Sequence, residues 1–126
     1  MSRDMERKVL EILTEALDRE PGETRLDHSL IDDLEAESID FLDIQFRLER
    51  AFGLKIPDDE IWRGSIDFED RRTFEDGRLT AAGRGMLEEL QPDFAWDRFP
   101  GEITGADLPR LITGRTLLHY LKRRLG

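Results

Sequence analysis

Residues 34–42 read Leu-Glu-Ala-Glu-Ser-Ile-Asp-Phe-Leu, and this stretch decides how the rest of the chain is interpreted. It places one hydroxyl, that of Ser38, where an amphipathic helix is expected to start. We predict a helix over residues 38–52, because apolar side chains recur there with helical spacing and Gly53 suits the position after a helix end. The expected apolar stripe consists of Phe41, Ile44, Leu48 and Phe52, widened by Leu42 and Phe46.

The serine is surrounded by acidic residues. These acids are Asp27, Asp32, Asp33, Glu35, Glu37, Asp40 and Asp43, and no lysine or arginine occurs between Arg25 and Arg47. Acids brought together without a base repel one another, so we expect added salt to stabilise the fold. A serine at a helix start is most often an N-cap, whose oxygen accepts a backbone N–H. The acidic, loop-borne context favours a functional interpretation of Ser38 instead.

Two longer stretches around this serine resemble the acyl carrier proteins. Residues 27–40 read Asp-His-Ser-Leu-Ile-Asp-Asp-Leu-Glu-Ala-Glu-Ser-Ile-Asp, and residues 48–58 read Leu-Glu-Arg-Ala-Phe-Gly-Leu-Lys-Ile-Pro-Asp. In that family an Asp-Ser-Leu tripeptide carries 4'-phosphopantetheine on its serine, so the resemblance implies that Ser38 carries this cofactor, supplied by coenzyme A. The resemblance covers about the first 60 residues and resumes at the C-terminus.

This sequence departs from the family pattern at four positions. Glu37 stands where the family has Asp, Ile39 where it has Leu, and Glu35 where Gly is usual. Arg50 stands where family members commonly carry an acid. By resemblance, the helix after Ser38 is the partner-binding element, and the expected recognition residues are Glu37, Ile39, Asp40, Asp43 and Glu49.

The length and net charge of the chain limit its domain organisation and the kinds of partner that it can bind. A chain of 126 residues fits a single domain, here expected to span residues 1–126. The net charge is −10, and the excess lies entirely in residues 1–60, with 18 acids against 8 bases. Such a surface repels nucleic acid and attracts partners with basic patches. There is no cysteine, so any thiol comes from a cofactor.

Apolar patterning predicts the remaining elements. We expect a helix over residues 3–19 ended by Pro21-Gly22, an Asp76-Gly77 turn and a Thr80-capped helix over residues 81–90. Residues 113–121 resemble the start of the family's last helix, which has an apolar face of Leu117, Leu118, Leu121 and Leu125. The fold class is therefore all-α, a small antiparallel helix bundle with three main helices and a short one. Residues 62–103 form an insertion relative to ordinary carriers. Its aromatic rings predict that it folds and covers apolar surface, either by simple burial of the rings or by lining the side from which an acyl chain enters.

No catalytic or metal-binding motif is present, and neither His28 nor His119 falls in one. The resemblance implies a carrier without enzyme activity, whose partners are a phosphopantetheinyl transferase and acyl-loading, acyl-modifying and acyltransferase enzymes. Three functions remain open: an acyl carrier, an aminoacyl or peptidyl carrier, and an unmodified interaction module. No apolar run is long enough to cross a membrane, and a cytoplasmic monomer is expected.

Overall fold

A computed structural model describes residues 2–57 and 71–125. In chain order the elements are α1 (Ser2–Ala16), α2 (Ser38–Phe52), β1 (Phe74–Glu75), β2 (Arg78–Leu79), α3 (Ala81–Leu90), the 3-10 helices η1 (Trp96–Arg98) and η2 (Leu108–Leu111), and α4 (Gly114–Leu125). Three parts of the sequence prediction lie outside the described residues: Trp62, Phe68 and the acids from Asp58, which suit the start of another short helix. The fold is a small, mostly helical bundle, as the fold-class prediction stated.

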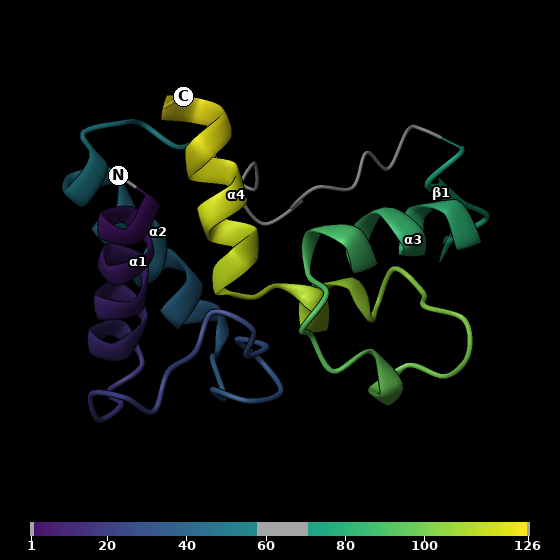
Figure 1. Cartoon of the computed structure of the whole chain (residues 1–126), viewed down its shortest axis with the longest axis horizontal. Helices are drawn as coiled ribbons and strands as arrows, with labels where there is room; N and C mark the ends of the chain where they lie inside the picture. Colours follow the sequence, from purple (N-terminus) through teal and green to yellow (C-terminus); the bar gives the residue numbers. More distant parts are fainter. Residues whose placement is uncertain (1, 58–70, 126) are drawn as a thin grey trace.

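The first part of the molecule, here the three-helix lobe, consists of α1, α2, α4 and the loop over residues 17–37 (Figure 1). Fully buried leucine and isoleucine side chains from all three helices and from the loop form its core. They include Leu13, Leu30, Ile44, Leu48, Leu117 and Leu121. The predicted packing of the first, second and last helices is therefore confirmed. The core also explains how a long loop stays ordered, because Leu26, Leu30 and Leu34 anchor it there.

The helix bounds agree with the sequence prediction at α2 and differ at α1. Gly53 follows α2 with φ 61° and ψ 40°, the left-handed conformation that ends a helix, and its N–H donates to the Glu49 carbonyl. α1 ends at Ala16, three residues before the predicted Arg19. The reason is local: Asp18 adopts φ 53°, which a continuing helix does not allow.

The second part, here the insert lobe, covers residues 71–111 and has an apolar cluster of its own. Phe94 and Phe99 are buried there with Leu79, Leu87, Ile103 and Leu111. The aromatic rings thus bury one another, which confirms for the described residues that the insertion is folded, and their cluster is separate from the core of the three-helix lobe. A small antiparallel hairpin, absent from the prediction, pairs Phe74 with Leu79 and Glu75 with Arg78.

Local sequence explains the insert lobe's first elements. Asp76 and Gly77 both have positive φ, 53° and 75°, which is the geometry of a tight two-residue hairpin turn. The side chain of Thr80 then accepts the N–H of Gly83 at 3.0 Å and caps α3, as predicted. α3 spans the predicted residues 81–90.

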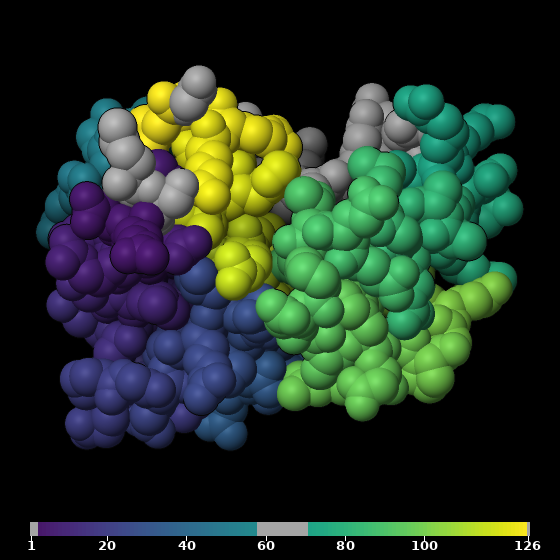
Figure 2. Space-filling model, viewed as in Figure 1, coloured from purple at the N-terminus to yellow at the C-terminus, as the bar shows by residue number. Residues whose placement is uncertain are grey.

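The two lobes lie side by side (Figure 2), and a buried amide joins them. Gln91, just after α3, donates from Nε2 to the Leu111 carbonyl at 3.3 Å. Its Oε1 accepts the hydroxyls of Thr113 and Thr116 at the start of α4. An unsatisfied buried amide is costly, so these bonds fix the end of α3 relative to α4.

Candidate functional site

Ser38 is the first residue of α2 and is exposed to solvent. The N-cap is Glu37, with φ −109° and ψ 171°, and the Asp40 carboxylate accepts the Glu37 N–H at 2.8 Å. No hydrogen bond to the Ser38 hydroxyl occurs within residues 2–57 and 71–125. Capping is therefore performed by the neighbours of Ser38, and its hydroxyl is left available for chemistry.

The surroundings of this hydroxyl fit a phosphate ester. α2 has 15 residues, and the positive end of its dipole favours an anion at the first turn. The exposure of Ser38 leaves room for a bulky group. Glu37 and Asp40 oppose the anion electrostatically, but their carboxylates are in a solvent-accessible position, where such repulsion is screened. Ser38 Oγ is thus the atom that would hold a phosphopantetheinyl group.

The outer face of α2 carries an apolar stripe next to Ser38. Ile39, Leu42 and Phe46 are 70%, 57% and 60% exposed. The prediction that Leu42 and Phe46 widen the buried stripe is wrong, because positions i, i+3 and i+7 from Ile39 lie on the face away from the buried Ile44 and Leu48. Exposed apolar groups of this size, grouped on one helix face, mark an interaction surface.

The acidic residues predicted to bind partners differ in their exposure and in the contacts that they already make within the chain. Glu37 is exposed, and Asp40 is half-buried in its capping contact. Asp43 is paired with Arg47, whose Nε lies 3.1 Å from its carboxylate. Glu49 accepts the N–H of Ile56 at 2.7 Å, so its carboxylate holds the segment after α2 in place. The structure therefore brings Glu37, Ile39 and Asp40 to Ser38 and gives Glu49 a structural contact.

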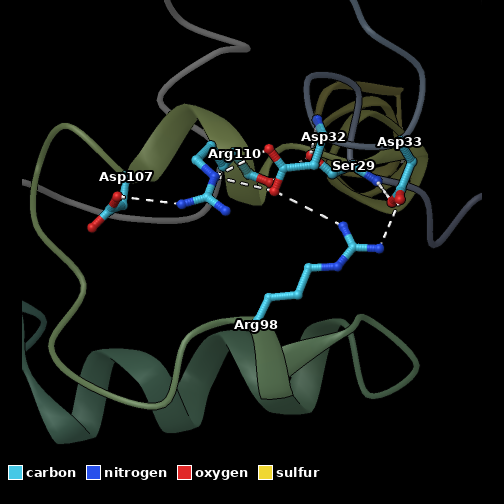
Figure 3. A network of polar contacts seen from close by, with 6 residues as sticks. All are labelled: Ser29, Asp32, Asp33, Arg98, Asp107 and Arg110. Carbon is cyan, nitrogen blue, oxygen red and sulfur yellow. Dashed lines mark hydrogen bonds and ion pairs between the residues drawn. The ribbon is translucent and has the colours of Figure 1, made fainter.

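The loop before Ser38 is not the unpaired acidic segment that the sequence suggested. Arg110 Nε lies 3.1 Å from both oxygens of Asp32, and Arg98 Nη2 donates to Asp33 at 2.7 Å (Figure 3). Similarly, Asp27 accepts Arg115 Nε at 3.0 Å. The premise that these acids repel one another is wrong, because arginines from the second half of the chain neutralise them.

Ser29 organises this network from a fully buried position. Its Oγ donates to the Arg110 carbonyl at 2.7 Å and accepts the Asp32 N–H at 3.0 Å. Its N–H donates to Asp33 at 2.8 Å. Partial burial works against ionisation of Asp33, but the hydrogen bonds from Arg98 and Ser29 and the charge of Arg98 outweigh it and hold the pKa of Asp33 below its ordinary value.

The described residues contain no group of three or more His, Asp or Glu side chains placed to hold a metal ion. Among the same residues, no helix has the length and apolar character needed to cross a bilayer. His28 accepts the Arg25 N–H through Nδ1 at 3.2 Å, a local loop contact. Burial and the nearby Arg123 and Lys122 lower the pKa of His119 on α4.

Comparison with known proteins bears on the same part of the chain. Residues 7–65 match the family model of the phosphopantetheine attachment site. The acyl carrier protein of Borrelia garinii subsp. bavariensis is 40% identical over 53 residues, which cover 42% of this chain and 66% of the relative. Those of Rickettsia canadensis and Rickettsia massiliae are each 36% identical over 56 residues, covering 44% of this chain and 65% of theirs.

The chain thus spans slightly less than two thirds of the length of these relatives. No solved structure matches the chain. The matched segment contains α2 and the exposed hydroxyl of Ser38, the features that the sequence pattern singled out. Residues 7–65 of this chain are therefore similar to the phosphopantetheine attachment site family, and acyl carrier proteins are among the relatives of this segment.

Proposed function

We propose that this protein carries acyl groups as thioesters on a 4'-phosphopantetheine arm attached to Ser38, working as a cytoplasmic monomer. The observation that carries the proposal is the exposed hydroxyl at the first residue of α2, which has no hydrogen bond to any described residue and lies inside the segment that matches the attachment-site family. The acyl carrier proteins among its relatives support acyl groups as the cargo.

In this account the chain holds a group and leaves the chemistry to partner enzymes. The bound arm supplies a thiol, which this cysteine-free chain lacks. In attachment, Ser38 Oγ would form the new bond to the phosphorus that carries pantetheine, the pyrophosphate bond of coenzyme A would break to release 3',5'-ADP, and the hydroxyl proton would be lost. Capping by Glu37 and Asp40 keeps that oxygen out of the hydrogen bonding of the helix.

Recognition would use the surface next to Ser38. Glu37 and Asp40 offer negative charge to the basic patch of a transferase, and Ile39 offers apolar area at the same place. Asp43, and more weakly Glu49, extend the acidic surface along α2. Arg47 already neutralises Asp43, and Glu49 lies eleven residues along α2 from Ser38, whereas Asp40 is beside Ser38 and accepts only a neutral backbone N–H. We therefore expect Asp43 and Glu49 to contribute less than Asp40.

The insertion over residues 62–103 supports a place outside the ordinary fatty-acid cycle. Its described part carries an apolar cluster of its own, which a minimal carrier does not need. We propose that residues 1–126 act as one carrier domain whose insertion adapts it to a specialised lipid or secondary-metabolite pathway.

Loading with labelled groups tests the proposed cargo. The protein, first treated with coenzyme A and a phosphopantetheinyl transferase, is offered acyl groups by an acyl-loading enzyme and amino acids by an adenylating one. We expect acyl label that is released by hydroxylamine, as a thioester is, and no label on Ser38→Ala. Label from amino acids alone would assign a peptidyl carrier, and a thiol arm that takes up neither class would refute the proposed cargo.

A further inference from the structure

The acidic side chains near Ser38 differ in how accessible they are to a partner enzyme. Asp32 and Asp33, on the loop that leads to Ser38, have side chains that are only 19% and 22% exposed. The carboxylate of Glu35 is 84% exposed and reaches Arg19 only at 3.7 Å. A basic enzyme that approaches Ser38 therefore meets Glu35, Glu37 and Asp40, and finds Asp32 and Asp33 already occupied.

The occupying arginines are held in place by the folded insert lobe. The Arg110 guanidinium lies 4.6 Å from the centre of the Phe99 ring, and its Nη1 lies 3.6 Å from Asp107. Arg98 belongs to η1 and reaches Asp33 at 2.7 Å and Asp32 at 3.9 Å. Both guanidiniums extend from this lobe toward the loop, as Figure 3 shows.

Guanidinium–carboxylate pairing is the chemistry that a basic partner would use on these acids. We propose that the insert lobe acts as a built-in competitor, in which Arg98 and Arg110 take the places of a partner's cations on Asp32 and Asp33. The lobe thereby restricts productive docking to enzymes that recognise the outer face of α2. This inference rests on the proposed attachment at Ser38, since the competition concerns enzymes that act there.

Freeing the two acids tests the competition. In the Arg98→Gln/Arg110→Gln variant, Asp32 and Asp33 become available and the charge near Ser38 becomes more negative by two. The kcat/KM for modification by a phosphopantetheinyl transferase should rise on the order of threefold to tenfold at low salt, because electrostatic steering raises the encounter rate. Most of that gain should disappear at about 0.5 M sodium chloride, where charges are screened.

Two matched variants isolate the effect. Arg78→Gln removes one positive charge from the same lobe, as Arg98→Gln alone does, but Arg78 pairs with Glu102 at 3.0 Å, away from the loop, so it should leave the rate unchanged. Adding Asp32→Asn and Asp33→Asn to the double variant should return the rate to that of the wild type. Circular dichroism confirms that each variant is folded. If the double variant unfolds, the single variant Arg98→Gln is used instead. It frees only Asp33, so its kcat/KM for modification should rise less than that expected for the double variant.

The outcomes are separable. A rate in the double variant that is equal to or below that of the wild type overturns the competition, as does an equal rise in Arg78→Gln or a gain that persists without the two aspartates. A wild type that no transferase modifies would refute the attachment at Ser38 and the competition with it. Modification of the wild type without any effect of the arginines would refute the competition alone.

Discussion

Glu35 is held with φ 58°, in the left-handed region that side chains with a β-carbon disfavour. The sequence pattern of the acyl carrier family usually has glycine at this position, and the backbone now supplies the physical reason. The loop must turn sharply here, because the Ala36 N–H returns to the Leu30 carbonyl at 2.8 Å before α2 begins.

We therefore predict that Glu35→Gly raises the free energy of unfolding by about 0.5–1 kcal/mol, because glycine adopts this conformation without the steric penalty. Urea unfolding measures the change. Glu35→Ala is the control: it removes the same exposed contact with Arg19 but keeps the β-carbon, so its effect should stay within about 0.5 kcal/mol of the wild type. Equal stabilities of the Gly and Ala variants would contradict the role of the backbone.

The ionisation of the Asp33 carboxyl group should make the stability of the protein depend on pH. Its pKa in the folded protein is lowered, so the stabilisation is fully present above the pKa of the unfolded chain and is lost as pH falls through the folded value. Asp33→Asn should cost about 1 kcal/mol at neutral pH, and the difference from the wild type should shrink below about pH 4. Melts from pH 7 to pH 2 measure it. In an Arg98→Gln background, Asp33→Asn should lower the free energy of unfolding clearly less than it does in the wild type. An equal loss in both backgrounds would argue against a stabilising ion pair between Asp33 and Arg98.

At the scale of elements, α3 contains two glycines with opposite roles. A β-carbon on Gly83 would clash with the Thr73 carbonyl oxygen and press against Leu79, whereas one on Gly85 would meet no atom within 4 Å. The first glycine allows α3 to pack closely on the hairpin. The second only weakens the helix, because glycine has a low helix propensity.

Alanine substitutions separate the two roles. Gly83→Ala should destabilise the insert lobe by at least about 2 kcal/mol through overpacking, and Gly85→Ala should stabilise α3 by about 0.5–1 kcal/mol through helix propensity. Hydrogen exchange at the amides of α3, compared with those of α1, measures each change in its own lobe. Effects of the same sign and size in the two variants would contradict this packing.

The elements that were predictable from sequence are those with local signals. α2 and α3 match their predicted bounds because Gly53 and Thr80 end or start them through contacts within a few residues. The outward direction of Leu42 and Phe46 was missed, since periodicity defines a stripe but not which apolar residues at its edge are buried. The hairpin was missed because each strand has only two residues, although its Asp-Gly turn was recognised.

At the scale of the whole molecule, the site depends on pairings that no local pattern contains. Asp33 and Arg98 are 65 residues apart, Asp32 and Arg110 are 78 apart, and Asp27 and Arg115 are 88 apart. The excess of acids in the first half of the chain is partly neutralised by arginines of the second half. Repulsion within the loop therefore no longer predicts stabilisation by salt. Around Ser38, the acids that no arginine of the insert lobe pairs with are the exposed Glu35 and Glu37 and the half-buried Asp40.

The central claim, that Ser38 carries the phosphopantetheinyl arm, is tested most directly by intact mass. The purified chain is incubated with coenzyme A and a phosphopantetheinyl transferase, alongside Ser38→Ala. The account predicts that the wild type gains the mass of one phosphopantetheinyl group, located on Ser38 by peptide fragmentation, and that Ser38→Ala gains none. An unmodified wild type with several transferases, or a Ser38→Ala protein that still gains the group, would contradict it.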